Sequence, residues 1–335
     1  WIDPLSQDLL EVIGRAITDL PVLLLTVYRP PETDEEGLSV RALNHFSEVR
    51  LQEFKPVEAE RLIQLKLESI FDESGSPSPR LITHLTERAE GNPFYIEELL
   101  NYIRDKGLDP KNESDLETLE LPSSLQSLIL SRIDQLAESQ KVTVRLASII
   151  GRLFAAAWLW GAFPEIGEEQ RIKGDLKVLS QLEITTLDKP EPELTYLFKH
   201  IVTQEVAYES LPYRTRALFH DQLAGFIESE IADQSDRFIY LLAFHYEQTE
   251  NQAKKKEYLL KAGQTAQANY ANSAAIEYYR KVLKLLPQEE QLPVMLKLGQ
   301  VLGLVGRWQE TEEIYQRILG MADEAGDRES RAWCQ

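Results

Sequence analysis

The stretch Pro192–Ile231, PELTYLFKHIVTQEVAYESLPYRTRALFHDQLAGFIESEI, places a short strand, a histidine and two helices in one segment. Leu194–Phe198 predicts a short strand, with Leu, Tyr and Phe on one face and Thr and Leu on the other. His200 follows at once, and apolar residues at helical spacing then predict a helix from Ile201 to the break at Pro212. A second amphipathic helix follows that proline, so the segment predicts a strand joined to a helical hairpin through one histidine.

His200 has two interpretations at such a strand-to-helix corner. It is either a structural histidine whose polar atoms are satisfied inside the core, or a residue that binds a ligand. The surrounding residues do not choose between them, and a second motif about a hundred residues upstream has to be considered together with it.

Composition sets the broad class of the protein. The chain has 335 residues, enough for two or three domains, and 43% hydrophobic residues, as in soluble globular proteins. A net charge of −19 argues against a nucleic-acid-binding surface, and no apolar run approaches the ~18 residues of a membrane span. The single Cys334 excludes an intramolecular disulfide or a cysteine-based zinc site and suits the cytoplasm, and the five histidines lack metal-ligand spacing.

Residues 1–54 are typical of the end of an α/β domain. A helix over Leu5–Leu20 precedes Val22–Val27, an apolar run that predicts a strand buried in a parallel sheet, and another short strand is expected around Val49–Phe54. Arg29 follows the apolar run, at the strand end where α/β sheets bind ligands. The alternative is a surface arginine before a turn.

Residues 55–120 are predicted to be helical throughout. Pro56 is placed to begin one helix, and the corner Gly91-Asn92-Pro93 is placed to end one helix and begin the next. The glycine suits a left-handed cap, and Pro93 suits a first helical position. From these residues alone, the simplest interpretation of this corner is a connection between two helices with no further role.

Residues 121–231 predict a winged-helix domain, with a further helix that starts at Leu121-Pro122-Ser123-Ser124 with a serine cap and runs to Leu136. Its helices and hairpin strands are expected at Gln140–Ile150, Ala155–Phe163, Glu168–Leu182, Ile184–Asp188 and Leu194–Phe198. The third of these helices has balanced charge and the hairpin is acidic, so we do not expect it to read DNA.

Residues 232–335 show repeat spacing. Gly263 and Gly299, each among apolar residues at helical spacing, lie 36 residues apart (299 − 263), close to the ~34 of tetratricopeptide repeats. An unrelated helical array is the alternative, and a third unit is expected to begin near Ser330.

Five segments in this order carry a family resemblance: WIDPLSQDLL, VLLLTVYRP, EGNPFYIEELL, LPSSLQSLILSRIDQL and ELTYLFKHIVTQEVAYESL. Across residues 1–230 the chain resembles the STAND class of P-loop ATPases, signal-transduction ATPases with numerous domains, most of all those attached to bacterial adenylate/guanylate cyclases. The resemblance implies a mainly α chain: the remnant of an α/β P-loop domain, a helical lid, a winged helix and a tetratricopeptide-like solenoid.

The resemblance also implies roles for three residues. Arg29 would sense the γ-phosphate, Pro93 would pack against the adenine, and His200 would reach the β-phosphate of ADP. The sequence contains no G-x-x-x-x-G-K-[ST] phosphate loop. This chain, beginning at Trp1, is therefore expected to be a piece of a longer protein. ATP or ADP with Mg is expected to bind that complete protein. The piece alone is expected neither to bind nucleotide tightly nor to hydrolyse ATP.

Partners follow from the same resemblance. The repeats are expected to bind a protein. An output domain, which the resemblance implies to be a cyclase or a kinase, is expected outside the chain. Two other functions stay open: a non-enzymatic winged-helix and repeat adaptor, or part of a transcriptional regulator. A phosphate loop upstream in the native protein would exclude the adaptor.

Overall fold

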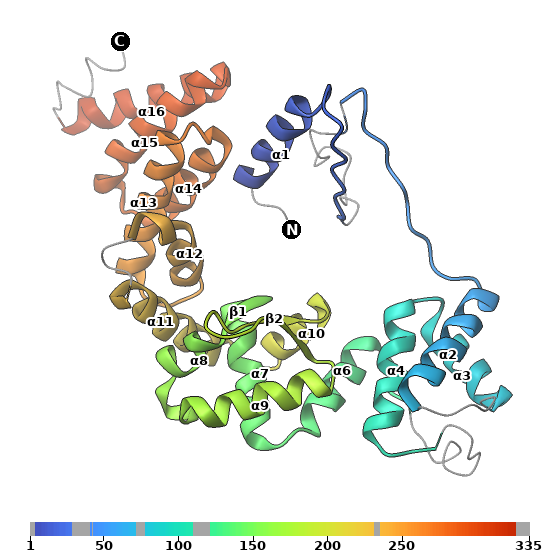
Figure 1. The fold of residues 1–335 in the computed structure, drawn as a ribbon. Coiled ribbons are helices and arrows are strands. Elements are labelled where there is room, and N and C mark those ends of the chain that lie inside the picture. The colour runs from blue at the N-terminus through green and yellow to red at the C-terminus, as the bar shows by residue number, and fades with distance from the viewer. Residues whose placement is uncertain are drawn as a thin grey trace. The chain divides into compact units, whose positions relative to one another are not determined.

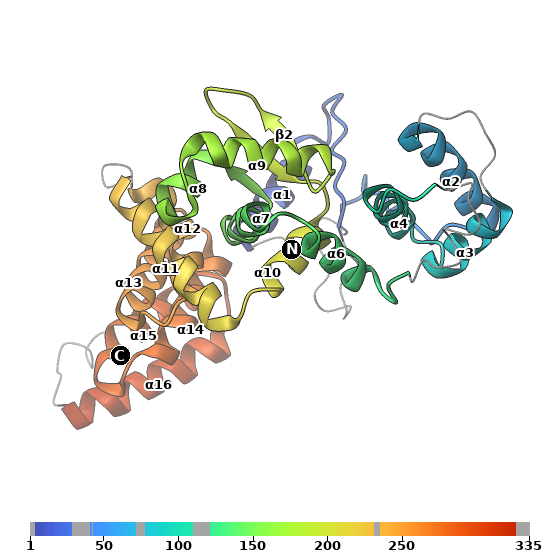
Figure 2. The same cartoon turned by 90° about the horizontal axis from the view of Figure 1, so that it is seen from below.

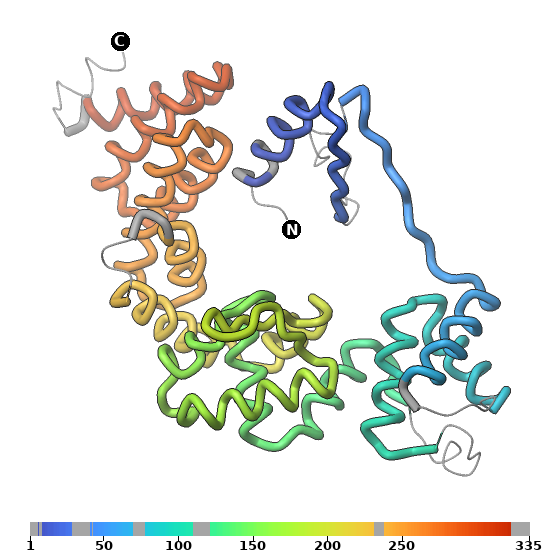
Figure 3. The backbone as a smooth tube through the Cα atoms, in the orientation of Figure 1, coloured from blue at the N-terminus to red at the C-terminus, as the bar shows by residue number. Residues whose placement is uncertain are grey.

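The computed structural model describes residues 4–28, 41, 43–71, 78–109, 121–230 and 235–325, and these are mainly helical (Figure 1). The chain divides into two compact units, Arg50–Glu230 on one side and Trp1–Val49 with Ile231–Gln335 on the other. Figure 3 traces the backbone of both. Among the described helices, none has the length and hydropathy needed to cross a bilayer.

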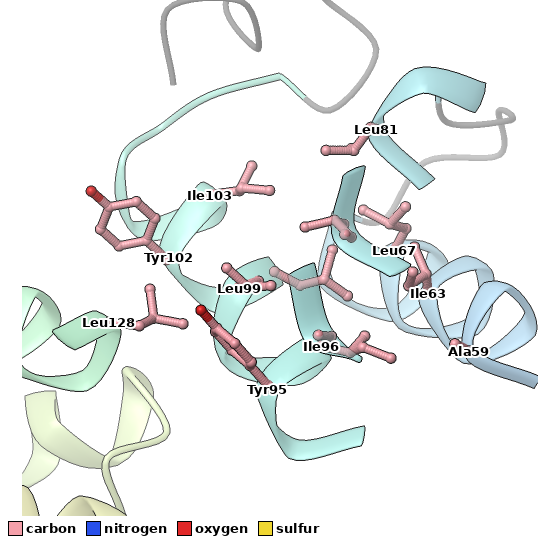
Figure 4. Close-up of a cluster of buried hydrophobic side chains, with 13 residues drawn as sticks. Ala59, Ile63, Leu67, Leu81, Tyr95, Ile96, Leu99, Tyr102, Ile103 and Leu128 are labelled. Atoms are coloured by element: carbon pink, nitrogen blue, oxygen red, sulfur yellow. The ribbon is translucent and has the colours of Figure 1, made fainter. Parts of the chain in front are cut away.

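Three helices of the unit Arg50–Glu230 share one apolar cluster: α2 (Pro56–Phe71), α3 (Pro79–Ala89) and α4 (Pro93–Asp105). Their inward side chains point toward one another in Figure 4, where Ile63, Leu67, Leu81, Ile96, Leu99 and Ile103 are labelled. Pro56 and Pro93 occupy first helical positions, as predicted. Burial of this cluster is the main force that holds the three helices together.

The corner before α4 combines two left-handed residues with a side-chain cap. Glu90 has φ 50° and Gly91 φ 78°, and the Asn92 side chain accepts hydrogen bonds from the backbone N–H groups of Phe94 and Tyr95. A Cβ on Gly91 would lie 2.4 Å from the Phe54 carbonyl oxygen, so the close approach requires glycine. The left-handed cap of α3 is thus Glu90, and Gly91 follows it.

The prediction of a strand around Val49–Phe54 is wrong. This segment has no strand assignment, and the Phe54 N–H instead donates to the Gly91 carbonyl at 2.8 Å. The described residues supply no partner strand for this segment, so its backbone forms no ladder.

In the remainder of this unit, the described residues form α-helices, a short 3-10 helix at Pro164–Ile166 and a three-stranded antiparallel sheet in the order β1-β3-β2 (Figures 1 and 2). The helices are α6 (Leu125–Asp134), α7 (Glu138–Ile150), α8 (Ala156–Ala162), α9 (Glu169–Gln181), α10 (Ile201–Glu209) and α11 (Tyr213–Glu230). The strands are β1 (Leu153–Ala155), β2 (Thr185–Lys189) and β3 (Thr195–Phe198). The predicted serine cap of α6 is Ser124, whereas β1 was not predicted.

The other unit contains consecutive helices that pack in pairs: α12 (Ser235–Glu247), α13 (Gln252–Ala268), α14 (Asn272–Leu285), α15 (Gln288–Leu304) and α16 (Trp308–Ala325). A Cβ on Gly263 would lie 2.8 Å from the Tyr279 ring, and a Cβ on Gly299 would lie 2.8 Å from the Tyr315 ring. The same glycine–tyrosine contact thus recurs at the predicted spacing. The unit expected from Ser330 lies outside the described residues.

The N-terminal prediction is corrected in two respects. The first helix, α1 (Pro4–Ala16), ends before Leu20, and residues 22–28 form no strand. Leu23 and Val27 are 90% and 89% exposed. An apolar run becomes a buried strand only when neighbouring strands bond to it, and none of the described segments does so.

Candidate functional site

His200 and the corner that begins α4 meet in space. His200 lies between β3 and α10, with extended backbone angles of φ −127° and ψ 141°. Its ring centroid lies 3.8 Å from that of Phe94, and the two planes are tilted by 32°. Phe94 follows Pro93 directly, so two motifs far apart in the sequence lie next to each other in the structure. We call the site formed by Pro93, Phe94 and His200 the His200 corner.

The imidazole of His200 is not satisfied as a structural histidine would be. Its Nε2 atom is buried and makes no hydrogen bond with any residue that the structure describes. Burial lowers the pKa of His200, and the charges of Lys199 and Arg152 lower it further, while Glu97 and Glu183 oppose the change. The ring is therefore neutral at pH 7. Its Nε2 atom can donate one hydrogen bond or accept one, depending on which ring nitrogen carries the proton.

Lys199, the neighbour of His200, links two elements through carboxylates. Its Nζ lies 2.6 Å from Glu97 of α4 and 2.6 Å from Glu183, which precedes β2. Lys66 of α2 also reaches Glu97, at 3.0 Å. Burial opposes ionisation of Glu97, but hydrogen bonds from Lys199 and Lys66 outweigh it and lower the pKa of that carboxyl. This network fastens α4 to the end of the sheet.

A buried arginine reinforces the same junction. The Arg132 guanidinium of α6 lies 2.6 Å from Glu98 and 2.8 Å from Asp105, both on α4, and donates to the Leu182 carbonyl at 2.7 Å. Only 4% of the Arg132 side chain is exposed. Because these contacts fix α4 against α6 and the turn before β2, they also fix Phe94 beside His200.

Arg152 stands at the end of the sheet that leads to His200. Leu153 of β1 pairs with Leu197 of β3, and one residue earlier the Arg152 carbonyl accepts a 2.8 Å hydrogen bond from the Phe198 N–H. The Arg152 side chain is exposed. Unlike Lys199, it makes no ion pair with the described part of the chain.

The predicted site residues have different outcomes. Pro93 is exposed at the start of α4, and His200 lies against the next residue, Phe94, so the structure brings these two together. Arg29 lies outside the described residues. Their assigned ligand contacts stay predictions. The described residues contain no cluster of three histidine, cysteine or carboxylate groups that would hold a metal.

Sequence reasoning missed the charged network around the corner. Lys199 is next to His200, and Glu97 and Glu98 follow Pro93 closely. Their proximity in the sequence to the predicted site residues could have indicated that they belong to the same site. Which carboxylate meets which cation was not visible, because Glu97 and Lys199 are 102 residues apart in the chain.

No protein-family model matches this chain, but it is similar to a curated protein and to a solved structure. An uncharacterized protein of Rhizobium meliloti (strain 1021) is 25% identical over 99% of this chain and 33% of its own length. The chain thus spans about a third of this relative. A crystal structure of a signal transduction ATPase with numerous domains and a tetratricopeptide repeat sensor, from Pyrococcus horikoshii, is 14% identical with a TM-score of 0.30, covering 85% of this chain and 56% of that one.

Proposed function

We propose that this chain is the C-terminal regulatory portion of a STAND-type signalling ATPase. In this proposal residues 1–54 complete an α/β domain, 55–120 form a helical lid, 121–231 form a winged helix and 232–335 form the sensing repeats. Nucleotide state and partner binding by the repeats are coupled to an output domain outside the chain, with a nucleotide cyclase favoured by the resemblance. The phosphate loop and the acids that bind Mg would also lie outside it.

The observation that carries this proposal is the contact between Phe94 and His200. A shared nucleotide site requires the corner assigned to adenine and the histidine assigned to phosphate to be neighbours. The buried Nε2 of His200, which has no protein partner in the described chain, fits a phosphate oxygen as its hydrogen-bond partner. Pro93 and His200 would hold ADP, and Arg29 would contact the γ-phosphate of ATP.

Two further features support the domain assignment. The order α7, β1, α8, α9, β2, β3 with the sheet order β1-β3-β2 supports the assignment of a winged helix. The apolar run at residues 22–28 has several strongly exposed side chains, and a parallel sheet supplied by the rest of an α/β domain would cover them. An adaptor made only of a winged helix and repeats gives that run no role.

Ligand contacts that differ between ADP and ATP would make the site a switch. ADP held by His200 favours one arrangement, and ATP contacting Arg29 favours another, since a ligand shifts an equilibrium only through differential contacts. A neutral His200 whose proton is on Nε2 donates one hydrogen bond to a phosphate oxygen, which accepts it.

The test has two parts. An antibody against this chain should detect a native polypeptide well above 38.4 kDa with a phosphate loop upstream. In that polypeptide, His200→Ala should speed loss of prebound ADP at least tenfold, while His84→Ala, at an exposed position on α3, should not. A native mass near that of the chain would favour the adaptor, and unchanged ADP loss would remove the role of His200.

A further inference from the structure

Large exposed apolar side chains of the repeat helices gather at two turns. Tyr270 lies in the turn between α13 and α14, and Leu304, Val305 and Trp308 lie in or beside the turn between α15 and α16. Leu304 is 70% exposed and Trp308 71%. Among the described residues 235–325, the remaining large exposed apolar side chain is Phe244 on α12. A single exposed apolar residue is ordinary, whereas a set of them in one place marks an interaction surface.

The two turns lie at the same edge of the repeat unit. α14 packs against both α13 and α15 and joins the end of the first to the start of the second, so α13 and α15 run in the same direction. Lys256 near the start of α13 lies 3.8 Å from Glu290 near the start of α15. Both helices have 17 residues, so helices that begin side by side also end side by side. We call Tyr270, Leu304, Val305 and Trp308 the apolar turn edge.

The side chains of the second turn surround a glycine. A Cβ on Gly306 would lie 3.8 Å from Trp308 Nε1, so the indole lies against the turn that Leu304 and Val305 enter. The equivalent positions of the first repeat, 36 residues earlier, are Ala268, Asn269 and Asn272. Apolar surface is therefore concentrated at the second turn, and Tyr270 extends it to the first.

The apolar turn edge is also free of charge in its sequence surroundings. Segments 262–276 and 298–306 contain no Asp, Glu, Lys or Arg, although 27% of the chain is charged. Charges begin at its border, where Arg307 pairs with Glu310 at 2.5 Å and Glu312 follows on α16. An apolar centre with a charged rim is the usual anatomy of a protein–protein interface.

We infer that the apolar turn edge binds a second copy of this chain through a two-fold contact. In such a contact the same patch of each copy meets, so the patch has to be complementary to itself. Two copies that each carry a net charge of −19 repel one another, and least so where an uncharged patch faces its equivalent. A basic partner would instead be attracted to acidic parts of the chain. The contact is separate from the His200 corner and does not depend on the proposed function.

The size of the patch sets the expected affinity. Four apolar side chains from each copy bury less than the standard interface of about 800 Å² per partner, so a dissociation constant on the order of 10–100 μM is expected. Association is therefore expected to be reversible and dependent on concentration. It would become appreciable only where copies are concentrated or held together by other parts of a longer protein.

The experiment is analytical ultracentrifugation of the whole chain from about 1 to about 500 μM, a range that brackets the expected dissociation constant. A reducing agent is present because Cys334 could link two copies. Trp308→Glu should weaken the dimer about tenfold or more, since it removes an aromatic anchor and places two like charges in the contact. Phe244→Glu is the matched control. It adds the same charge near the end of α12, which leads to the start of α13 and hence to the opposite edge, and should change the dissociation constant less than about twofold.

A second variant separates loss of the contact from loss of the fold. Ser273 is exposed in the first turn of α14, close to Tyr270, and an acidic residue there is favoured by the helix dipole. Ser273→Glu should therefore keep the circular dichroism spectrum and thermal unfolding of the wild type while weakening the dimer. An unchanged dimer in both Ser273→Glu and Trp308→Glu would overturn the inference.

Salt dependence tests the physical basis of the contact. Raising NaCl from about 50 to about 500 mM should strengthen the dimer, because salt screens the repulsion between the two acidic copies and leaves apolar contact in place. A dimer that weakens with salt would be held by ion pairs, and equal weakening by Phe244→Glu and Trp308→Glu would place the contact elsewhere. Either result, or a chain that stays monomeric at every concentration, overturns the inference.

Discussion

His220 is a buried histidine outside the candidate site. It is 1% exposed on α11, and its Nε2 lies 3.0 Å from the Tyr208 hydroxyl of α10. Burial, together with the charge of Arg216, lowers the pKa of His220 from 6.5 to about 4. The native state therefore keeps this ring neutral at pH values where the unfolded chain already binds a proton.

That difference predicts a loss of stability in acid. As pH falls from 6.5 to about 4, the unfolded state is favoured, so His220 should lower the free energy of unfolding by up to about 3 kcal/mol. His220→Gln should flatten this part of the pH dependence in urea titrations followed by circular dichroism. His84→Gln, at an exposed position, should leave the wild-type slope in place, and an equal slope in His220→Gln would contradict the prediction.

Tyr270 has a left-handed backbone conformation, which is uncommon for residues other than glycine. It has φ 59° in the turn between α13 and α14, and 36 residues later (306 − 270) the equivalent turn has Gly306 with φ 76°. Tyr270 is 84% exposed, so little packing offsets the cost of the left-handed backbone. The two turns thus have the same left-handed conformation, at a residue with a Cβ atom (Tyr270) in one and at a glycine (Gly306) in the other.

We expect Tyr270→Gly to raise the free energy of unfolding of the repeat unit by about 0.5–1 kcal/mol, because it relieves the Cβ clash at φ 59°. Gly306→Ala should lower it by about 1 kcal/mol for the converse reason. Thermal and urea unfolding give both values. Changes of the same sign in the two variants would show that the backbone conformation is not the deciding factor.

At the scale of single elements, glycines within α15 have different surroundings. A Cβ on Gly299 would meet the Tyr315 ring at 2.8 Å, whereas a Cβ on Gly303 would meet only Thr311 at 3.8 Å, an ordinary contact. The first glycine therefore permits α15 and α16 to approach closely. The second has no such packing requirement.

Gly299→Ala is expected to destabilise the repeat unit by about 1–3 kcal/mol, since the added methyl group overpacks the helix pair. Gly303→Ala should stabilise it by up to about 1 kcal/mol through helix propensity alone. Both substitutions lie in one helix, so propensity cancels in the comparison, which urea unfolding measures. Equal effects would mean that the Tyr315 contact does not determine helix spacing.

Local signals explain which elements the sequence predicted well. Ser124, Pro56 and Pro93 mark helix starts through their own backbone and side-chain chemistry, and each helix begins there. The three-residue strand β1 has no such signal, because it exists only through pairing with β3, about forty residues later. The strand predicted at Val22–Val27 is absent for a related reason: a strand forms only when neighbouring strands pair with it, and the described residues supply none.

The candidate site shows the same limit. The sequence singled out Pro93 and His200, and the structure brings their neighbourhoods together. It did not indicate Phe94 as the ring that meets His200. This contact depends on how α4 docks on α6 and on the sheet, which is set by packing and charge pairs between distant segments.

At the largest scale, Arg132 joins the parts of the unit Arg50–Glu230. It connects α6 to Glu98 and Asp105 of α4 and to the Leu182 carbonyl before β2, and it is almost fully buried. Replacing one member of a buried ion pair leaves the other charge without compensation, which is more costly than replacing both. The position of α4, and hence of Phe94 beside His200, depends on this arginine.

Arg132→Met is therefore expected to cost the unit about 3–5 kcal/mol, and Glu98→Met in addition should recover part of that loss, because the double variant leaves one fewer buried charge unpaired. Arg280→Met is the matched control: its exposed pair with Glu310 joins α14 to α16 and should be worth less than about 1 kcal/mol. Urea unfolding followed by circular dichroism measures these variants and Glu98→Met alone, which completes the double-mutant cycle. Losses that simply add in the double variant would show that Glu98 and Arg132 are not coupled, and the rigid placement of the His200 corner would then need another cause.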